Sequence, residues 1–355
     1  MRYQGIKVSI ITGFLGAGKT TLIHQLIAQA PPYEKWAVLL NEFGDIGLDS
    51  ALLGSALGEN SAVAIKEVAG GCVCCVTSAA FEQGLNQLIR QVNPDRILIE
   101  PSGLGHPKQI LAKLRSEYYQ QVLAVTGVFC VLDARKLSDS RYLQHEIFRD
   151  QLAIADGIIP SHEEAYSSAD QQALKALVGE LNEENSTQWI DRQLPTHQWL
   201  DIGLKDTPTN GLAVMDSHNS HDHGSHSNHN HDHGEHHHHH HEHHSTQGTK
   251  SAVLDNGVRH YRKQQDTMAV MGWQWPAQTS FKQAFLIQLL TESLALKGVY
   301  RLKGVFCLQT GEALFVNGAD GQLQTHVGTW SMESRLEIIG LSQASWEHSL
   351  KINAL

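Results

Sequence analysis

Residues 13–20 are the part of this chain whose types and spacing best fit a chemical role. They read Gly-Phe-Leu-Gly-Ala-Gly-Lys-Thr and match the phosphate-binding pattern Gly-x-x-x-x-Gly-Lys-Ser/Thr at every fixed position. In that pattern glycines let backbone N–H groups surround phosphate oxygens, the lysine places its charge on the β and γ phosphates, and the hydroxyl ligates Mg²⁺. The alternative is a glycine turn that precedes a helix by chance. We expect a nucleoside triphosphate to be bound by Gly13, Gly16, Ala17, Gly18, Lys19, Thr20 and Thr21.

Three closely spaced cysteines form a second candidate site. Cys72, Cys74 and Cys75 follow two glycines. In extended backbone Cys72 and Cys74 point to the same side, and a local bend lets Cys75 complete a three-sulfur site. Thiolates favour Zn²⁺ or Cu⁺ over Mg²⁺, and three of them leave a fourth position for a carboxylate, water or a partner's ligand. The alternatives are a buried structural site with a distant fourth ligand and a thiol redox pair.

Carboxylates stand at the ends of two apolar segments. Glu42 and Asp45 follow the first segment, and Glu100 ends the second, three residues before Gly103. Open parallel sheets bind ligands at the carboxyl ends of their strands, so Glu42 and Asp45 are candidates to face Mg²⁺, the γ-phosphate or a second metal. The alternative is a solvated acidic loop. Glu100 is a candidate for the magnesium shell and Gly103 for sensing the γ-phosphate, unless Glu100 only caps a turn.

A parallel sheet would bring these groups together. Apolar segments typical of buried strands alternate with segments whose apolar residues recur at helical spacing. The pattern predicts an α/β fold, a P-loop NTPase domain with a mostly parallel sheet flanked by helices, over residues 1–207. The expected strands are 6–11, 36–40, 63–68, 95–100, 122–132 and 187–190, and the expected helices include 21–27, 78–92, 148–156 and 169–181.

The composition changes abruptly beyond this domain. The stretch 218–244 holds 15 of the 23 histidines, with almost no apolar residue. Such a segment cannot form a core, so we predict that 208–264 is a flexible, disordered linker. Neutral imidazoles bind zinc, nickel and copper, which makes the stretch a candidate metal-collecting or metal-storing arm. The alternatives are an uncharged spacer and an inserted purification tag.

Regular patterns return after the linker, and residues 265–355 predict a small α+β domain. A strand at 268–275, a helix at 280–296, a hairpin of 299–308 with 313–317, a strand at 335–340 and a helix at 342–350 are indicated. The domain carries no separate catalytic signature. It is a candidate surface for a client protein or for self-association.

The overall composition narrows the classes of partner. The chain has 355 residues, 41% of them apolar, and a formal net charge of −10 without a basic block. These values argue against nucleic acid and anionic membranes as partners. Apolar runs are shorter than the roughly 18 to 20 residues of a membrane span, and the nucleotide motif leaves no room for a signal peptide before it. We expect a cytoplasmic protein.

Taken together, the motifs at 13–21, 41–44, 70–75 and 100–103 resemble those of the CobW-type P-loop GTPases, relatives of UreG and HypB. The likeness is closest to the YeiR-like zinc-binding GTPases, through 34–39 and 99–111. The resemblance implies GTP hydrolysis coupled to zinc or cobalt handling, with Lys19 and Thr20 holding phosphate and Mg²⁺. It also implies that Asp45 occupies a metal-associated position where relatives often have Glu, and that the transferred metal binds to Cys72, Cys74 and Cys75.

One motif of the family is altered in this chain. Where relatives recognise guanine with Asn-Lys-x-Asp, this chain has Ser161, His162, Glu163 and Glu164. Glu164 still offers a carboxylate, but Ser161 lacks an amide and His162 lacks the aliphatic stem that covers the base. We therefore expect GTP to be the nucleotide, with looser discrimination against ATP than relatives have. His162, Glu163 and Glu164 are also a candidate metal site or, alternatively, a solvated polar loop.

Three functions fit these features. The first is a GTP-hydrolysing zinc metallochaperone that transfers Zn²⁺ to a client protein and uses Mg²⁺ at its nucleotide site. The second is a zinc store or buffer with a regulatory nucleotide site. The third, a phosphate-loop kinase, leaves the cysteines unexplained and has no visible second substrate site. Self-association into a homo-oligomer is compatible with the first two.

Overall fold

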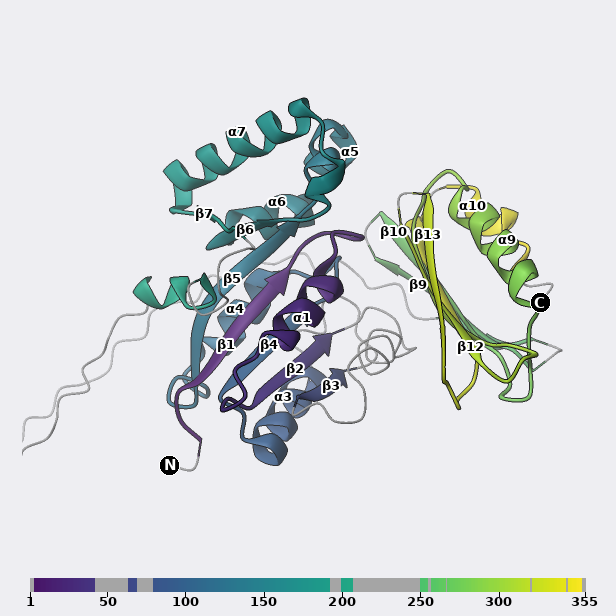
Figure 1. Cartoon of the computed structure of the whole chain (residues 1–355), viewed down its shortest axis with the longest axis horizontal. Coiled ribbons are helices and arrows are strands. Elements are labelled where there is room, and N and C mark those ends of the chain that lie inside the picture. Colours follow the sequence, from purple (N-terminus) through teal and green to yellow (C-terminus); the bar gives the residue numbers. More distant parts are fainter. Residues whose placement is uncertain are drawn as a thin grey trace, which may run out of the picture.

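The computed structural model describes residues 3–41, 63–68, 79–191, 199–206, 250–254, 257–265, 267–319, 321–342 and 344–352. These residues form two seven-stranded sheets, each packed against helices (Figure 1). We call the part built on the first sheet the first domain and the part built on the second sheet the second domain. Each sheet has its own buried apolar clusters, and one further cluster joins the two domains.

The first sheet is parallel throughout, with the strand order β3-β2-β4-β1-β5-β6-β7. Its strands read as nearly continuous apolar runs because helices cover both faces. This confirms the predicted α/β fold, and β7 completes the sheet where the sequence predicted it. The strands are β1 (Ile6–Thr12), β2 (Trp36–Asn41), β3 (Ala64–Val68), β4 (Arg96–Pro101), β5 (Leu123–Leu132), β6 (Gly157–Pro160) and β7 (Gln188–Trp189).

Helices cover the first sheet on two sides. Leu26 of α1 packs in one cluster with Val38, whereas Leu85 of α3 packs in another with Ile10, so the two helices lie on opposite faces. Helices α6 and α7 pack beside β5 and β6. The helices are α1 (Lys19–Ala28), α3 (Ala79–Val92), α4 (Pro107–Leu114), α5 (Ser140–Leu143), α6 (Glu146–Ala153) and α7 (Ser168–Asn185), with short 3-10 helices η2 (Ala134–Ser138), η3 (Glu163–Ala165) and η4 (Ile202–Asp206).

The second sheet is antiparallel throughout, with the order β13-β12-β11-β14-β10-β9-β8. One face packs on helices α9 (Gln283–Leu294) and α10 (Trp346–Ser349), the second of which is shorter than the predicted 342–350 helix. The strands are β8 (Lys250–Val253), β9 (Arg259–Gln265), β10 (Met268–Gln274), β11 (Val299–Cys307), β12 (Ala313–Ala319), β13 (Gln322–Gly328) and β14 (Arg335–Leu341).

The second sheet begins earlier in the chain than the sequence indicated. Strand β8 and all of β9 except its last residue lie within 208–264, the segment expected to be a linker. The strand β9 reads Arg-His-Tyr-Arg-Lys-Gln-Gln, which has no apolar alternation. Its polar side chains have partners on both faces: Arg262 binds Glu347 of α10, and Tyr261 on the other face donates to Glu337 of β14. The histidine-rich stretch 218–244 lies outside the described residues.

The second domain turns its other face toward the first domain. Figure 1 shows α9 and α10 on the side of the second sheet that points away from the first domain. Met268, Val270 and Ile339, from β10 and β14, share a buried cluster with Phe14 and Leu15 of the first domain. The buried apolar cluster that extends across both domains therefore includes residues of the phosphate-binding loop itself. Among the described residues, none of the helices has the length and apolar character needed to span a membrane.

Candidate nucleotide-binding site

The phosphate-binding loop, residues 13–20, connects the carboxyl end of β1 to the first turn of α1. Its backbone needs glycine. Gly13, Gly16 and Gly18 have φ values of 142°, 76° and 91°, a region that L-residues with a Cβ rarely adopt. A Cβ on Gly13 would also lie 2.5 Å from the carbonyl oxygen of Val131 in β5. The loop is thus held against the neighbouring strand in a shape that other residues would disrupt.

Helix α1 begins without a side-chain cap. Its N-cap residue is Gly18, and no side chain accepts a hydrogen bond from the first-turn N–H groups. The first turn also contains no acidic residue. Uncapped N–H groups and the positive end of the helix dipole favour an anion at this position. The backbone therefore has the properties of a phosphate site.

Lys19 supplies the central charge of the loop. Its side chain is buried, with 5% of its surface exposed, and Nζ donates to the carbonyl oxygen of Phe14 at 3.3 Å. Burial lowers the pKa of Lys19 to about 8, although the nearby Glu100 carboxylate acts in the opposite direction. A buried ammonium group is stabilised by a second negative charge. Phosphate oxygens at the helix terminus would provide it.

Thr20 and Glu100 meet beside Lys19. The hydroxyl of Thr20 donates to Oε1 of Glu100 at 2.9 Å. Thr20 is in α1, the helix that follows β1, and Glu100 is near the carboxyl end of the neighbouring strand β4. Glu100 is 5% exposed. Oxygen ligands next to bound phosphates are the set that Mg²⁺ prefers, so these two side chains fit the ion that the sequence motif implies.

Gly103 lies against the phosphate-binding loop. A Cβ at Gly103 would lie 3.0 Å from the backbone nitrogen of Leu15, so a side chain here would force the two backbones apart. Its carbonyl oxygen accepts from Nε2 of Gln151 at 3.1 Å. Gln151, on α6, was not identified from the sequence. Gln151 shares the buried helical face of Ile147 and Leu152, so its amide needs a buried partner, but the sequence does not indicate which one.

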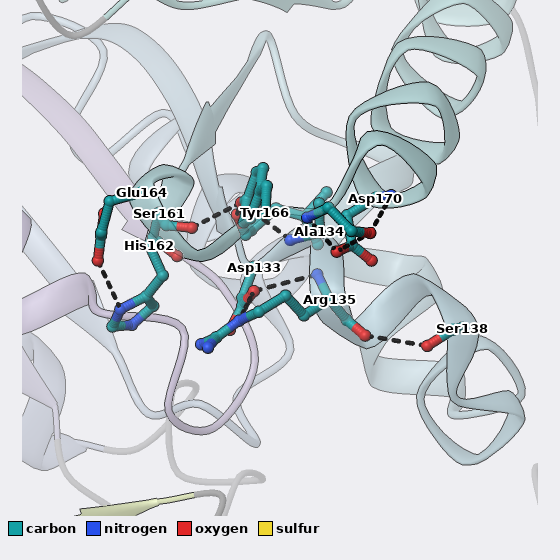
Figure 2. Close-up of polar contacts among 11 residues, drawn as sticks. Asp133, Ala134, Arg135, Ser138, Ser161, His162, Glu164, Tyr166 and Asp170 are labelled. Carbon is teal, nitrogen blue, oxygen red and sulfur yellow. Dashed lines mark hydrogen bonds and ion pairs between the residues drawn. The ribbon is translucent and has the colours of Figure 1, made fainter.

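The loop after β6 carries the residues expected to contact the base. Ser161 is buried, and among the described residues its Oγ has no hydrogen-bond partner. Figure 2 shows Tyr166 beside Ser161. Its hydroxyl donates to the carbonyl oxygen of Ser161 at 2.6 Å and accepts from the N–H of Ala134 at 2.9 Å. This one hydroxyl therefore joins the loop after β6 to the turn after β5.

His162 and Glu164 lie at the outer side of the same loop. His162 adopts the left-handed conformation, with φ of 58°, and lines the cleft beside Gly18. Its Nδ1 is 3.9 Å from Oε1 of Glu164 (Figure 2). The Glu164 side chain is 80% exposed. His162 and Ser161 are thus adjacent to the phosphate-binding loop, while the Glu164 carboxylate extends into solvent.

A cleft of about 640 Å³ opens over these groups. The phosphate-binding loop and Glu100 form one wall, and strands β11, β12 and β13 of the second domain form the other. Arg301 and Lys303 of β11 and His326 of β13 contribute to the second wall. These three residues were not predicted, because nothing in the sequence indicates where the second domain docks.

The predicted metal ligands Glu42, Asp45, Cys72, Cys74 and Cys75 all lie outside the described residues. Elsewhere, in the residues with a described placement, no group of three or more His, Cys, Asp or Glu side chains is arranged to hold a metal ion. What the structure does describe is where the two segments leave the first sheet.

The strands that lead into those segments are neighbours. β2 ends at Asn41 and β3 ends at Val68, and these two residues are register partners in a parallel pair. The chain therefore departs toward Glu42 and toward the cysteines from adjacent points, on the edge of the sheet where β1 meets the phosphate-binding loop.

Comparison with known proteins gives matches over both domains. Residues 7–188 match the CobW/HypB/UreG nucleotide-binding domain, and residues 270–351 match the cobalamin synthesis protein CobW C-terminal domain. The chain is 36% identical to "Zinc chaperone YeiR" of Escherichia coli K12 over 348 residues, which is 96% of this chain and 94% of that protein. It is 31% identical to "Zinc chaperone YjiA" of the same organism, over 60% of this chain and 64% of that protein.

A solved structure also aligns with the chain. The crystal structure of Zn(II)-bound YjiA GTPase from E. coli aligns over 99% of this chain and 98% of that one, with a TM-score of 0.38 and 18% identity.

Proposed function

Because this chain belongs to the CobW/HypB/UreG family, we propose that it is a GTP-hydrolysing zinc metallochaperone. In this proposal it binds Zn²⁺ through Cys72, Cys74 and Cys75 and transfers the ion to a client protein in a step controlled by the bound nucleotide. The names of its relatives, zinc chaperones, support the choice of metal.

The nucleotide is bound through its phosphates. The N–H groups at the start of α1 and the ammonium of Lys19 bind the β and γ phosphates, and the shape of the loop supports this assignment. Mg²⁺, when bound, neutralises charge on the phosphates. Thr20 would hold that ion, and Glu100 would accept a hydrogen bond from water bound to it, roles supported by the 2.9 Å hydrogen bond between the two side chains.

Hydrolysis depends on how the chain positions groups around the terminal phosphate. Lys19 stabilises negative charge on the phosphoryl oxygens, and the backbone N–H of Gly103 contacts the γ-phosphate. Gln151 holds the Gly103 turn through its 3.1 Å hydrogen bond and so acts as a positioning residue. We expect slow intrinsic turnover, because the sequence has no recognisable glutamine that would orient the attacking water.

The base is recognised by the loop at 161–164. Ser161 offers a buried hydroxyl with its hydrogen-bonding capacity unused among the described residues, and His162 lies beside the phosphate-binding loop. Glu164 contributes its carboxylate by turning inward from its exposed position. Since this set replaces Asn-Lys-x-Asp, we expect GTP to be preferred over ATP by a smaller ratio than in relatives. Equal displacement of a bound GTP analogue by ATP would remove the preference for guanine.

The observation that carries the proposed coupling is the pairing of Asn41 with Val68. It supports a short path between the nucleotide and the metal, because the segments with Glu42, Asp45 and the cysteines leave the sheet at the nucleotide edge. Triphosphate binding at that edge would change the geometry of both segments. Hydrolysis would reverse the change and release zinc to the client.

The test is the zinc affinity of the protein lacking residues 218–244. Chelator competition would measure it with Mg²⁺ and a nonhydrolysable GTP analogue, with GDP, and without nucleotide. We expect a difference of about tenfold or more, equivalent to about 1.4 kcal/mol. The matched variant Cys74→Ser should lose the tightest site in every nucleotide state. Equal affinities in all three states would refute coupling within the isolated chain.

A zinc store is the second candidate, and the 15 histidines in 218–244 favour it. In a store the histidine-rich arm would provide the tight binding. Deleting 218–244 would then eliminate tight zinc binding. In the metallochaperone the same deletion lowers the number of bound ions more than the peak affinity, so one titration separates the two functions.

A further inference from the structure

The side chains that line the nucleotide cleft carry an excess of positive charge. The cleft is lined by five lysine or arginine side chains and, counting only described residues, by a single carboxylate, Glu100. Three of the cations belong to the first domain and two to the second. The cations are Lys19, Arg135, Lys136, Arg301 and Lys303. In a chain with a net charge of −10, such a concentration of positive charge marks a site for a polyanion.

The two second-domain cations are placed there by strand alternation. Leu302 and Phe306 of β11 belong to the core under α9. Arg301 and Lys303 alternate with them and so lie on the opposite face, toward the first domain. Lys303 is 4% exposed, which is rare for a lysine. Its cross-strand neighbour is Glu337, whose Oε2 accepts from the hydroxyl of Tyr261 at 2.8 Å.

These cations are close enough to influence the phosphate-binding lysine. The positive charges of Arg301 and Lys303 each contribute to lowering the pKa of Lys19. Lys19 occupies the position that contacts the β and γ phosphates in this loop. Arg301 and Lys303 line the same cleft as Lys19, on the opposite wall, so they lie across from the position of the terminal phosphate. Arg135 is bound to Asp133 by hydrogen bonds of 2.6 to 3.1 Å in the turn after β5.

We propose that Arg301 and Lys303 of the second domain bind the terminal phosphate of the nucleoside triphosphate held by the first domain. The planar fork of Arg301 suits two phosphate oxygens, and Lys303 adds a point charge from a fixed, buried position. The second domain is then a sensor of the γ-phosphate. Triphosphate holds the two domains together, and the diphosphate left by hydrolysis does not. This inference rests on the proposed GTPase function and adds the residues that distinguish GTP from GDP.

The test compares triphosphate and diphosphate affinity in the full-length protein. Arg301→Ala would be titrated with a nonhydrolysable GTP analogue and with GDP, both with Mg²⁺. We expect the analogue to bind about tenfold more weakly or worse, as for loss of a charge-assisted hydrogen bond, while GDP changes less than about threefold. The matched control is Arg259→Ala, an exposed arginine on β9 of the same sheet, which should change neither affinity.

Two further variants guard against loss of folding. Arg301→Lys keeps the charge without the fork and should recover part of the lost affinity. Lys303→Met keeps most of the side-chain volume and should also weaken the analogue selectively. An unchanged ratio of the two affinities in both Arg301→Ala and Lys303→Met overturns the proposal, whether the separate affinities fall together or stay constant.

The proposed GTPase function is tested separately, with wild type and the Lys19→Ala variant. If wild type hydrolyses GTP and Lys19→Ala does not, the GTPase assignment stands even when Arg301→Ala leaves the ratio unchanged. If wild type binds no triphosphate, both the proposed function and this inference fail.

Discussion

The two seven-stranded sheets of this protein contribute to one cleft in different ways. The first is parallel, covered by helices on both faces, and contributes through the loops at its strand ends. The second is antiparallel, covered by helices on one face, and contributes through side chains on the other. A parallel sheet gathers backbone N–H groups and loop residues at an edge, whereas an antiparallel face presents every second side chain. The backbone cradle and the opposing cations therefore have separate structural origins.

The largest expected effect tests the edge of the first sheet. Lys19→Ala should weaken binding of the GTP analogue by about hundredfold or more, because it removes charge-assisted contacts to two phosphates. Isothermal titration would measure the affinity, and Lys175→Ala, an exposed lysine on α7, is the control. Unchanged hydrolysis in Lys19→Ala would contradict the site assignment.

Two glycine substitutions compare the backbones of the two sheets. Gly13→Ala should destabilise the protein by about 3 kcal/mol or more, because it combines a strained φ with a contact of 2.5 Å to Val131. Gly311→Ala, in the second domain, has φ of 87° and no atom within 4 Å, so it should cost about 1 kcal/mol. Urea unfolding would measure both. Equal losses would mean that the contact with β5 does not constrain the loop.

The pH dependence of nucleotide binding tests Lys19 without a substitution, and its expected effect is smaller. Lys19 has a pKa of about 8, and the triphosphate binds its charged form, so binding takes up a proton above pH 8. Affinity should be flat below pH 8 and fall by up to about tenfold per unit above it. Without nucleotide, the contribution of Lys19 to folding stability changes in the opposite direction, because between pH 8 and 10.5 the folded protein has lost the Lys19 proton while the unfolded chain still holds it. This contribution therefore rises with pH in that range. Lys19→Ala should abolish both trends, and affinity that is constant from pH 7 to 10 would contradict the assignment.

The smallest expected effect concerns the ion pair that holds α10 against the second sheet. Arg262 of β9 makes two hydrogen bonds to Glu347 of α10, at 2.7 and 2.8 Å. Arg262→Gln should lower the free energy of unfolding by about 1 kcal/mol, as expected for a partly buried bidentate pair. Nucleotide affinity should not change, because this residue lies on the face away from the cleft. Altered GTP binding in this variant would show that the two faces of the second sheet are not independent.

The first domain was largely predictable because its signals are local. Continuous apolar runs indicated β1, β2 and β5, and the glycine pattern fixed the phosphate-binding loop between β1 and α1. The four-residue strand β6 was too short to be recognised. Gln151 was missed for a different reason: its partner, the carbonyl oxygen of Gly103, lies 48 residues away, and no local pattern encodes that contact.

The second domain was less predictable because its polar face is satisfied only by tertiary packing. Arg301 and Lys303 interrupt the apolar pattern of β11, and their placement opposite Lys19 depends on how two domains dock across about 280 residues of sequence. Strand β9 has no apolar alternation because both of its faces meet polar partners. Such a strand looks like linker until the sheet beside it is known.

Phe14 and Leu15 belong at once to the phosphate-binding loop and to the apolar cluster that includes Met268, Val270 and Ile339. Separating the domains would therefore expose apolar surface to water, and exposing such surface raises the heat capacity. Exchange of GTP for GDP that parts the domains would carry a heat-capacity change, seen as a temperature-dependent enthalpy of nucleotide binding. Exchange within a closed cleft would not, so calorimetry at several temperatures can report domain opening without any label on the protein.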